Sequence, residues 1–261
     1  MPDSMSELRS VIRVIDFETS GGSPPDTCIV EVGRCDLIRI QVIGRDPIWN
    51  VGLPHSALVT PTRPISPEGR AVHHITDREF TSAVDPSRVP LIVTKEGLAP
   101  GENIVALAAH AVADGVLLPG AGIPWIFIYK VALRLFPEAP RHSLQVLRYW
   151  LDLDLRTKFS LPAHRAGPDA FVTAQILARM FALGLTMEDA LTWSSQPPLL
   201  PRVTFGRYRG TPWADVDTGF LRWVLERQFH SDIRYAAEVE LTRRGAAAAA
   251  PETVSMTEET R

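Results

Sequence analysis

Five side chains in this sequence could together perform metal-assisted hydrolysis. Asp16 and Glu18 end an apolar run, Asp114 lies mid-chain, and His164 precedes Asp169 by five residues at the start of an apolar helical pattern. Carboxylates are the oxygen ligands that Mg²⁺ prefers. Two such ions about 3.5–4 Å apart can activate a water and stabilise a leaving oxygen. Four carboxylates and one histidine are therefore the groups that two-metal hydrolysis of a phosphodiester needs.

The spacing within each motif predicts how these groups are presented. Asp16 and Glu18 are two residues apart, so on a strand both point to the same face. Asp169 would face inward from the first turn of its helix, while a neutral His164 on the preceding loop could accept a proton from water. Each motif alone also fits a simpler interpretation, as solvated loop groups or as a first-turn acid that interacts with the helix dipole. Their combination favours the metal site.

The elements that must position these groups follow from hydrophobic periodicity and from turn residues. Strands are expected at residues 11–17, 27–40, 49–60, 103–109 and 124–128, with the first two antiparallel. Helices are expected at residues 111–118, 129–136, 143–151, 168–183, 186–193 and 217–229, and Ser66 is expected to cap a short one. This pattern predicts an α/β fold, a mixed sheet flanked by helices, with a small C-terminal appendage.

Length and composition bound the organisation of the chain. The 261 residues are 45% apolar and carry a net charge of −3, so contact with nucleic acid would need a local basic face or metal ions. Two cysteines and no stretch of about 20 apolar residues predict a cytoplasmic protein without a membrane span. We expect four segments: a flexible N-terminus (1–10), a main domain (11–195), a small basic module (202–240) and a disordered tail (245–261).

In order and spacing, residues 11–185 resemble the DnaQ-like 3′–5′ exonucleases, the subgroup whose signature is Asp-Glu-Asp-Asp plus His. The stretches at 15–19, 62–76 and 164–170 carry the resemblance. It implies a ribonuclease H-like fold and two Mg²⁺ ions, with Mn²⁺ as a substitute. It also implies roles for the five groups: Asp16 bridging both ions, Glu18 and Asp169 completing one shell, Asp114 holding the other ion, and His164 as the general base.

The resemblance also implies a substrate. The substrate would be DNA with a 3′ end, either single-stranded or duplex. The product would be a 5′-mononucleotide. Phe17 and Thr19 would lie against the terminal nucleotide. His73 fits a position near that nucleotide, and it equally fits an ordinary surface histidine.

The second motif of the family is poorly matched. Members of the family carry an Ala-His-Asn run, then an aromatic residue and the central Asp. Counting back from Asp114 places His110 where Asn is expected and Ala113 where the aromatic residue is expected. Anchoring on His110 instead places Gly115 at the acid position. We keep Asp114 as the third carboxylate, with an impaired site as the alternative, and His110 as a structural residue or a ligand.

A basic stretch follows the main domain. Residues 202–234 hold six arginines against four acids, the reverse of the whole chain. Arg207 and Arg209 could bind a phosphate backbone while Tyr208 stacks on a base. The alternative is a small hairpin packed on Trp223.

Three functions remain open at this level. The leading hypothesis is a metal-dependent 3′–5′ exonuclease acting on DNA. An exoribonuclease of the same fold is the second, because nothing in the sequence reveals a preference about the 2′-hydroxyl. A non-catalytic nucleic-acid-binding protein is the third, and the poor second motif is its main support.

Overall fold

The computed structural model describes residues 9–249 except 24, 41–43, 45–46 and 112–121. The chain divides into two compact units, an N-terminal unit (residues 1–196) and a C-terminal unit (residues 197–261). The predicted third carboxylate, Asp114, lies outside the described residues. None of the helices in the described part of the chain is long and apolar enough to cross a membrane.

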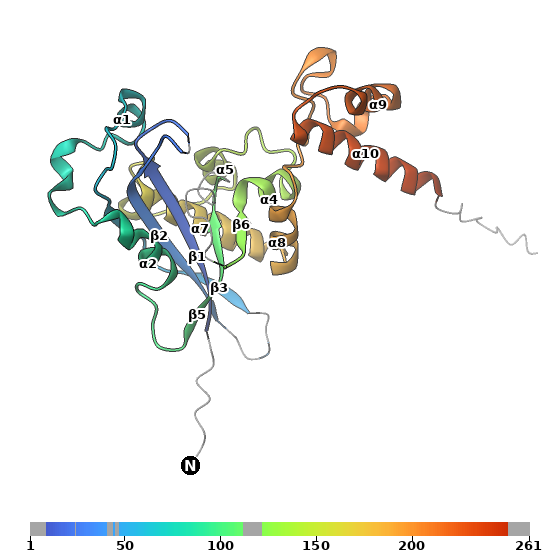
Figure 1. Ribbon diagram of the computed structural model, residues 1–261. Helices are drawn as coiled ribbons and strands as arrows, with labels where there is room; N and C mark the ends of the chain where they lie inside the picture. The colour runs from blue at the N-terminus through green and yellow to red at the C-terminus, as the bar shows by residue number, and fades with distance from the viewer. Residues whose placement is uncertain (1–8, 24, 41–43, 45–46, 112–121, 250–261) are drawn as a thin grey trace, which may run out of the picture. The chain divides into compact units, whose positions relative to one another are not determined.

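A six-stranded mixed sheet forms the centre of the N-terminal unit (Figure 1), with strand order β3-β2-β1-β5-β6 and β4 paired with β2. The two parallel pairs are β1 with β5 and β5 with β6, whereas β2 pairs antiparallel with β1, β3 and β4. The strands are β1 (Arg9–Thr19), β2 (Ile29–Ile40), β3 (Ile48–Val51), β4 (His55–Leu58), β5 (Glu102–Ala109) and β6 (Trp125–Phe127). The predicted mixed sheet and the antiparallel first pair are confirmed.

The single strand expected at residues 49–60 is wrong, because the structure divides it into β3 and β4. Gly52 donates a backbone hydrogen bond to Asp36 at 2.8 Å, and Pro54 has no N–H to give to a ladder. The chain therefore leaves β2 after β3 and rejoins it further along as β4.

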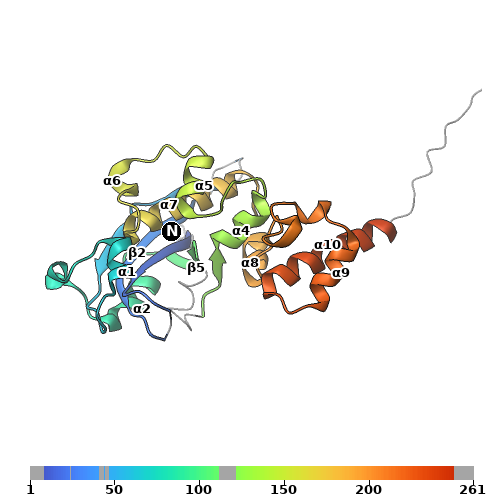
Figure 2. The same cartoon turned by 90° about the horizontal axis from the view of Figure 1, so that it is seen from above.

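Helices cover both faces of the sheet, and Figure 2 shows α7 on one side and α2 on the other. Alternate residues of β1 supply the two cores. Ile12 and Val14 pack in a cluster with α7 residues such as Ala174, while Val11 and Ile15 pack in a second cluster with α2 residues such as Val93. The helices of this unit are α1 (Pro67–His73), η1 (Asp77–Ser82), η2 (Pro86–Arg88), α2 (Val89–Thr94), α4 (Ile128–Leu135), α5 (Leu144–Trp150), α6 (Thr157–Ser160), α7 (Ala166–Ala182) and α8 (Met187–Ser195).

The capping prediction at Ser66 is confirmed. The Ser66 hydroxyl accepts the backbone N–H of Gly69 at 3.0 Å, and Pro67 occupies the first turn of α1. This cap satisfies one of the free N–H groups at the helix start.

The C-terminal unit has its own small core, formed by Val203, Trp213, Val216, Leu221, Val224, Ala236 and Ala237. Its elements are η3 (Gly206–Tyr208), η4 (Trp213–Asp215), α9 (Thr218–Glu226) and α10 (Ser231–Ala249). Asp217 caps α9 by accepting the backbone N–H of Phe220 at 2.7 Å. Helix α10 continues to Ala249, past residue 245 where the tail was expected to begin, because alanine is the strongest helix former.

Candidate active site

Three of the predicted carboxylates meet at one end of the sheet. Asp16, Glu18 and Asp169 each offer an oxygen atom, and these atoms lie within 4.8 Å of one another. Asp16 and Glu18 continue the even-numbered positions of β1, which face α7, and Asp169 lies in the first turn of that helix. The strand period therefore brings two acids to the face where the helix presents the third.

Gly33 allows α7 to begin so close to these acids. It lies opposite Asp16 in the β1–β2 pairing. A Cβ atom added at Gly33 would lie 2.0 Å from the backbone carbonyl of Ala166, the first residue of α7. No side chain fits between strand and helix here, so glycine sets the short distance between the two backbones.

Asp169 is buried and held by two hydrogen bonds. Gln145 donates its side-chain amide to Oδ1 at 3.0 Å, and the backbone N–H of His164 donates to Oδ2 at 2.9 Å. Burial raises the pKa of the Asp169 carboxyl above its usual range, and the bond from His164 works against that rise. Each oxygen keeps a lone pair for a cation, which would favour the charged form.

His164 lies on the loop before α7 with its side chain exposed to solvent. Its backbone has a φ of 59°, a left-handed conformation that is uncommon outside glycine. The bond from its N–H to Asp169 fixes this conformation and ties the backbone of the loop to one acid of the cluster.

A buried ion pair anchors the same loop to the sheet. Arg165 donates from Nε and Nη2 to the two carboxylate oxygens of Glu31, both at 2.9 Å, and the N–H of Ala166 donates to Glu31 at 3.0 Å. Glu31 lies directly opposite Glu18 on the neighbouring strand and is almost fully buried. These bonds raise the pKa of Arg165. The position of His164 therefore depends on a carboxylate of β2.

Sequence reasoning missed Glu31 and Gln145. The signal for Glu31 was available, because it is a charge between the apolar residues Val30 and Val32 of a predicted strand, and a buried charge needs a partner. The signal for Gln145 was absent, since nothing in its helical pattern distinguishes it from a surface residue.

His73 is neither a surface residue nor free to bind by its ring nitrogens. It is buried, its Nδ1 accepts the backbone N–H of Ile75 at 3.0 Å, and its Nε2 lies 3.1 Å from the carbonyl oxygen of Thr19. Burial lowers the pKa of His73 and favours the neutral ring that these two bonds require. The ring thus supports the end of β1, directly after the two acids.

Phe17 and Thr19 occupy the odd-numbered positions of β1. Phe17 is 7% exposed and packs in the core cluster on the face away from Asp16 and Glu18. Thr19 is half-buried at the strand end. Their contact with a terminal nucleotide stays a prediction.

His110 directly follows Ala109, the last residue of β5. Its Nδ1 is buried without a hydrogen-bond partner among the described residues, and its ring lies edge-on to Tyr129. Burial lowers the pKa of His110 to about 4, so the ring is neutral at pH 7. Within the described part of the chain it joins no cluster of metal-binding side chains.

Arg207 and Tyr208 lie on the 3₁₀ turn η3 within a short antiparallel hairpin, in which Val203 donates its N–H to Thr211 at 2.9 Å and accepts that of Gly210 at 2.8 Å. The Tyr208 hydroxyl donates to Asp217 at 2.5 Å, and its ring packs edge-on against Phe220 at 4.7 Å. The Arg207 guanidinium lies over the Tyr208 ring at 4.8 Å, while Arg209 is exposed. The hairpin thus packs through Tyr208 on Phe220, whose ring stacks on Trp223 at 5.6 Å.

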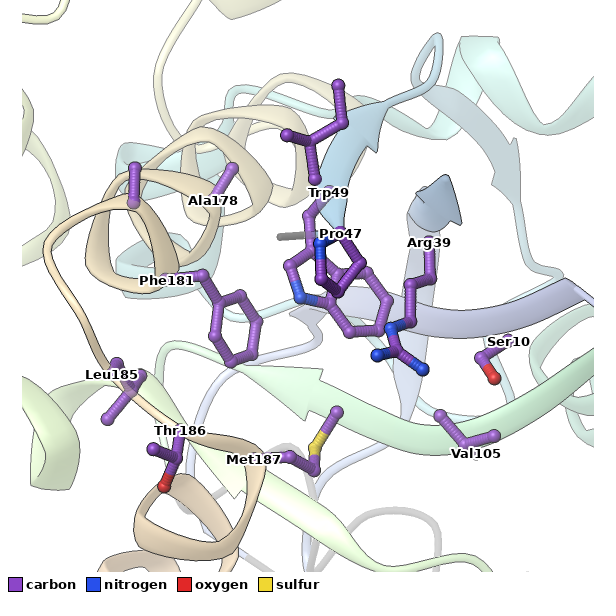
Figure 3. A pocket seen from close by; sticks show the side chains of 12 residues that line it. Ser10, Arg39, Pro47, Trp49, Val105, Ala178, Phe181, Leu185, Thr186 and Met187 are labelled. Atoms are coloured by element: carbon purple, nitrogen blue, oxygen red, sulfur yellow. The ribbon is translucent and has the colours of Figure 1, made fainter. Parts of the chain in front are cut away.

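A large cavity lies at the other end of the sheet and is a different feature. Its volume is about 720 Å³, and Figure 3 shows Trp49 and Phe181 among its lining, with their rings stacked 5.2 Å apart. Ser10, at the start of β1, also lines it. Ser10 is six residues before Asp16, about 20 Å at the usual strand rise. None of the described residues of its lining is acidic, in contrast to the carboxylate cluster.

Comparisons with known proteins agree with this geometry. A family model described as "Exonuclease" matches residues 14–177. The sequence is 34% identical over 219 residues to "Exodeoxyribonuclease 10" of Escherichia coli strain K12, covering 82% of this chain and 90% of that protein.

Solved structures give the same result for the fold. "Exonuclease X in complex with 5′ overhanging duplex DNA" superposes with a TM-score of 0.55 and 30% identity, covering 70% of this chain and 99% of that one. A "full-length 3′-exonuclease" superposes with a TM-score of 0.51 and 19% identity over 67% of this chain and 61% of that one, which supports the fold alone.

Proposed function

This chain belongs to the exonuclease family, and from that premise we propose that it is a metal-dependent 3′–5′ exodeoxyribonuclease that releases 5′-mononucleotides from DNA. The observation that carries the proposal is the convergence of Asp16, Glu18 and Asp169 within 4.8 Å. The DNA substrate is supported by the likeness to an exodeoxyribonuclease and to a nuclease solved with overhanging duplex DNA.

The donor set fits Mg²⁺, with Mn²⁺ as a substitute. Asp16, Glu18 and Asp169 offer only carboxylate oxygens, the ligands that hard divalent cations prefer. When bound, a pair of such ions would supply an activated water and stabilise charge on the leaving oxygen. Asp114, known here only from the sequence, is proposed as the fourth carboxylate.

His164 is proposed as the general base that accepts a proton from the attacking water. Its exposed ring can reach solvent, while its backbone is tied to Asp169 and its neighbour Arg165 is tied to Glu31. This arrangement leaves the imidazole free and restricts its loop, which is the combination that proton transfer needs. Cys28 and Cys35 are both free thiols, consistent with the reducing cytoplasm where we propose that the protein acts.

The test is cleavage of 5′-labelled DNA and RNA in Mg²⁺, Mn²⁺ or EDTA. We expect a ladder that shortens from the 3′ end of DNA with either metal and none in EDTA. Cleavage of RNA alone would instead indicate an exoribonuclease, and binding without cleavage would indicate a non-catalytic protein.

A pair of variants assigns the activity to the carboxylate cluster. Asp16→Asn should reduce cleavage by on the order of 10³-fold, because the amide removes a charged metal ligand. Glu188 is an exposed acid on α8, at the other end of the sheet. The control variant Glu188→Gln should cleave like the parent protein.

A further inference from the structure

The C-terminal unit contains a hollow of about 550 Å³ that the proposed catalytic chemistry does not use. We call it the aromatic hollow; it is lined by Phe205, Gly206, Arg207, Asp217, Gly219, Phe220 and Trp223. The volume lies in the usual range of small-ligand pockets. All of its lining belongs to one compact unit, so its shape is a property of that unit.

Aromatic rings in contact with one another line the hollow. Phe220 and Trp223 stack with ring centroids 5.6 Å apart, and Phe205 lies 5.9 Å from Phe220. Trp223 is 39% exposed, although its neighbours Leu221 and Val224 are completely buried in the core of the unit. A Cβ atom added at Gly206 would meet nothing within 4 Å, so this side of the hollow is open. The exposed part of the indole is a surface on which a flat ring can stack once Arg227, which lies over the ring, moves to a phosphate.

Cationic groups border these rings. The Arg207 side chain is 75% exposed, and the Arg227 guanidinium lies 5.7 Å from the centre of the Trp223 ring. The lining also contains a carboxylate, Asp217. Its oxygens already accept the Phe220 N–H at 2.7 Å and the Tyr208 hydroxyl at 2.5 Å, and Arg207 lies 3.6 Å away. The border therefore offers positive charge to an anionic ligand.

We propose that the aromatic hollow binds an unpaired base of single-stranded DNA, with Trp223 stacked on the base and Arg207 and Arg227 contacting adjacent phosphates. A π-surface bordered by guanidinium groups is the combination that proteins use to hold single strands without sequence preference. The role of the ligand as a substrate strand rests on the proposed exodeoxyribonuclease function. The match to the exodeoxyribonuclease covers 82% of the chain, more than the 196 of 261 residues in the N-terminal unit, so that likeness extends into this unit.

Trp223, in place of the Tyr208 expected from the sequence, is the residue proposed to stack on the base. Tyr208 is a poor candidate, because its hydroxyl is bonded to Asp217 and its ring packs edge-on against Phe220. Trp223 keeps an exposed surface and has the larger ring. The contribution of Arg207 to phosphate binding is retained.

The experiment compares binding of two strands by the full-length protein in EDTA, where no cleavage occurs. Fluorescence anisotropy would follow an oligothymidylate and an abasic strand of equal length, which has the same phosphates and no bases. Trp223→Ala should weaken binding of oligothymidylate about 10-fold, the usual scale of one stacked base, and leave binding of the abasic strand unchanged. Trp223→Phe should retain most of the affinity for oligothymidylate.

Controls separate stacking from unfolding and from general aromatic loss. Tyr149→Ala removes a 68% exposed ring in the N-terminal unit and should leave both affinities unchanged. Thermal melting of Trp223→Ala would show whether the C-terminal unit stays folded, and if it does not, Trp223→Phe against Trp223→Leu gives the same comparison with a large side chain kept. An unchanged affinity of Trp223→Ala for oligothymidylate (or of Trp223→Leu where the alanine variant unfolds), or an equal loss on both strands, would overturn the proposal.

The outcome is independent of the nuclease assignment. If the parent protein cleaves no DNA but Trp223→Ala loses base-dependent binding, the exonuclease function fails and the base site remains. If Trp223→Ala cleaves a trinucleotide and a long strand as the parent does, and binds each strand with the affinity of the parent, the base site fails and the exonuclease remains.

Discussion

In the N-terminal unit, Asp16, Glu18 and Asp169 bring negative charge together within 4.8 Å, whereas in the C-terminal unit guanidinium groups border stacked aromatic rings. Residues 1–196 carry 18 Lys and Arg against 21 acids, and residues 197–249 carry 8 against 6. A polyanion is repelled by the first arrangement and attracted by the second.

The two units would therefore contact the same polymer through different interactions. The acids can approach a phosphate only with divalent cations between them, so metal controls contact at that site. The aromatic hollow needs no metal, because its arginines and rings can bind a strand directly. Removing metal should therefore abolish cleavage and spare binding.

The largest expected effect concerns the N-terminal unit alone. His164→Ala should lower kcat about 10²- to 10⁴-fold, because a positioned general base is lost. The pH–rate profile should also change in the variant, because the group that accepts the proton is gone. A pH–rate profile measured on a trinucleotide checks both, and an unaltered profile would contradict the role of His164 as the base.

A smaller effect is expected at the ion pair that supports the same loop. Glu31→Gln breaks the two-point contact with Arg165 and should lower kcat about 10-fold by loosening His164 and Asp169. It should also lower the free energy of unfolding by about 1–3 kcal/mol, because a buried charged partner is lost. Glu79→Gln, which removes an exposed contact 3.8 Å from Arg165, is the matched control and should change little. Equal kcat values for the two variants would contradict the positioning role.

A still smaller effect on activity is expected from two arginines of the C-terminal unit. Arg207→Ala combined with Arg209→Ala should raise KM for long DNA several-fold and leave cleavage of a trinucleotide unchanged. Each phosphate contact contributes about 0.7 to the salt dependence of binding on a single strand, so the slope should fall by about 1.4. Titrations at several salt concentrations measure the slope. An unchanged slope would remove these arginines from DNA binding.

The smallest effect is on stability and is confined to the C-terminal unit. Hydrogen bonds from Arg243 and, to a smaller extent, from Arg244 lower the pKa of Glu240 to about 2, from an ordinary 4.5. A lowered pKa in the folded state stabilises the protein above pH 4.5, and this stabilisation is lost as the pH falls toward 2. Glu240→Gln should therefore be less stable than the parent by roughly 1 kcal/mol at pH 7, with the difference vanishing near pH 2. Urea denaturation at both pH values tests this, and a constant difference would contradict it.

The periodicity of apolar residues predicted the long strand and the long helix, whose patterns are regular over many residues. The strand at 11–17 and the helix at 168–183 have long, regular apolar periods, and the structure contains both, with ends shifted by about two residues. Short helices such as α2 and α6 were not predicted, because segments of four to six residues depend on packing for their stability.

The site divides in the same way. Asp16, Glu18 and Asp169 could be predicted because each lies in a recognisable local motif. The pairing of Glu31 with Arg165 spans 134 residues, and no local pattern names the partner. The aromatic hollow combines Phe205 with two rings of α9, so it exists only once the unit has folded. The fourth carboxylate, Asp114, stays a prediction.

The close contact at Gly33 limits how this protein can be redesigned. Replacing strand glycines by alanine is a common way to gain stability through the unfolded chain. At this position the new methyl group would push the first turn of α7 away from β2 and carry Asp169 with it. Alanine at residue 33 would therefore cost stability as well as turnover, so a search for heat resistance should keep this glycine.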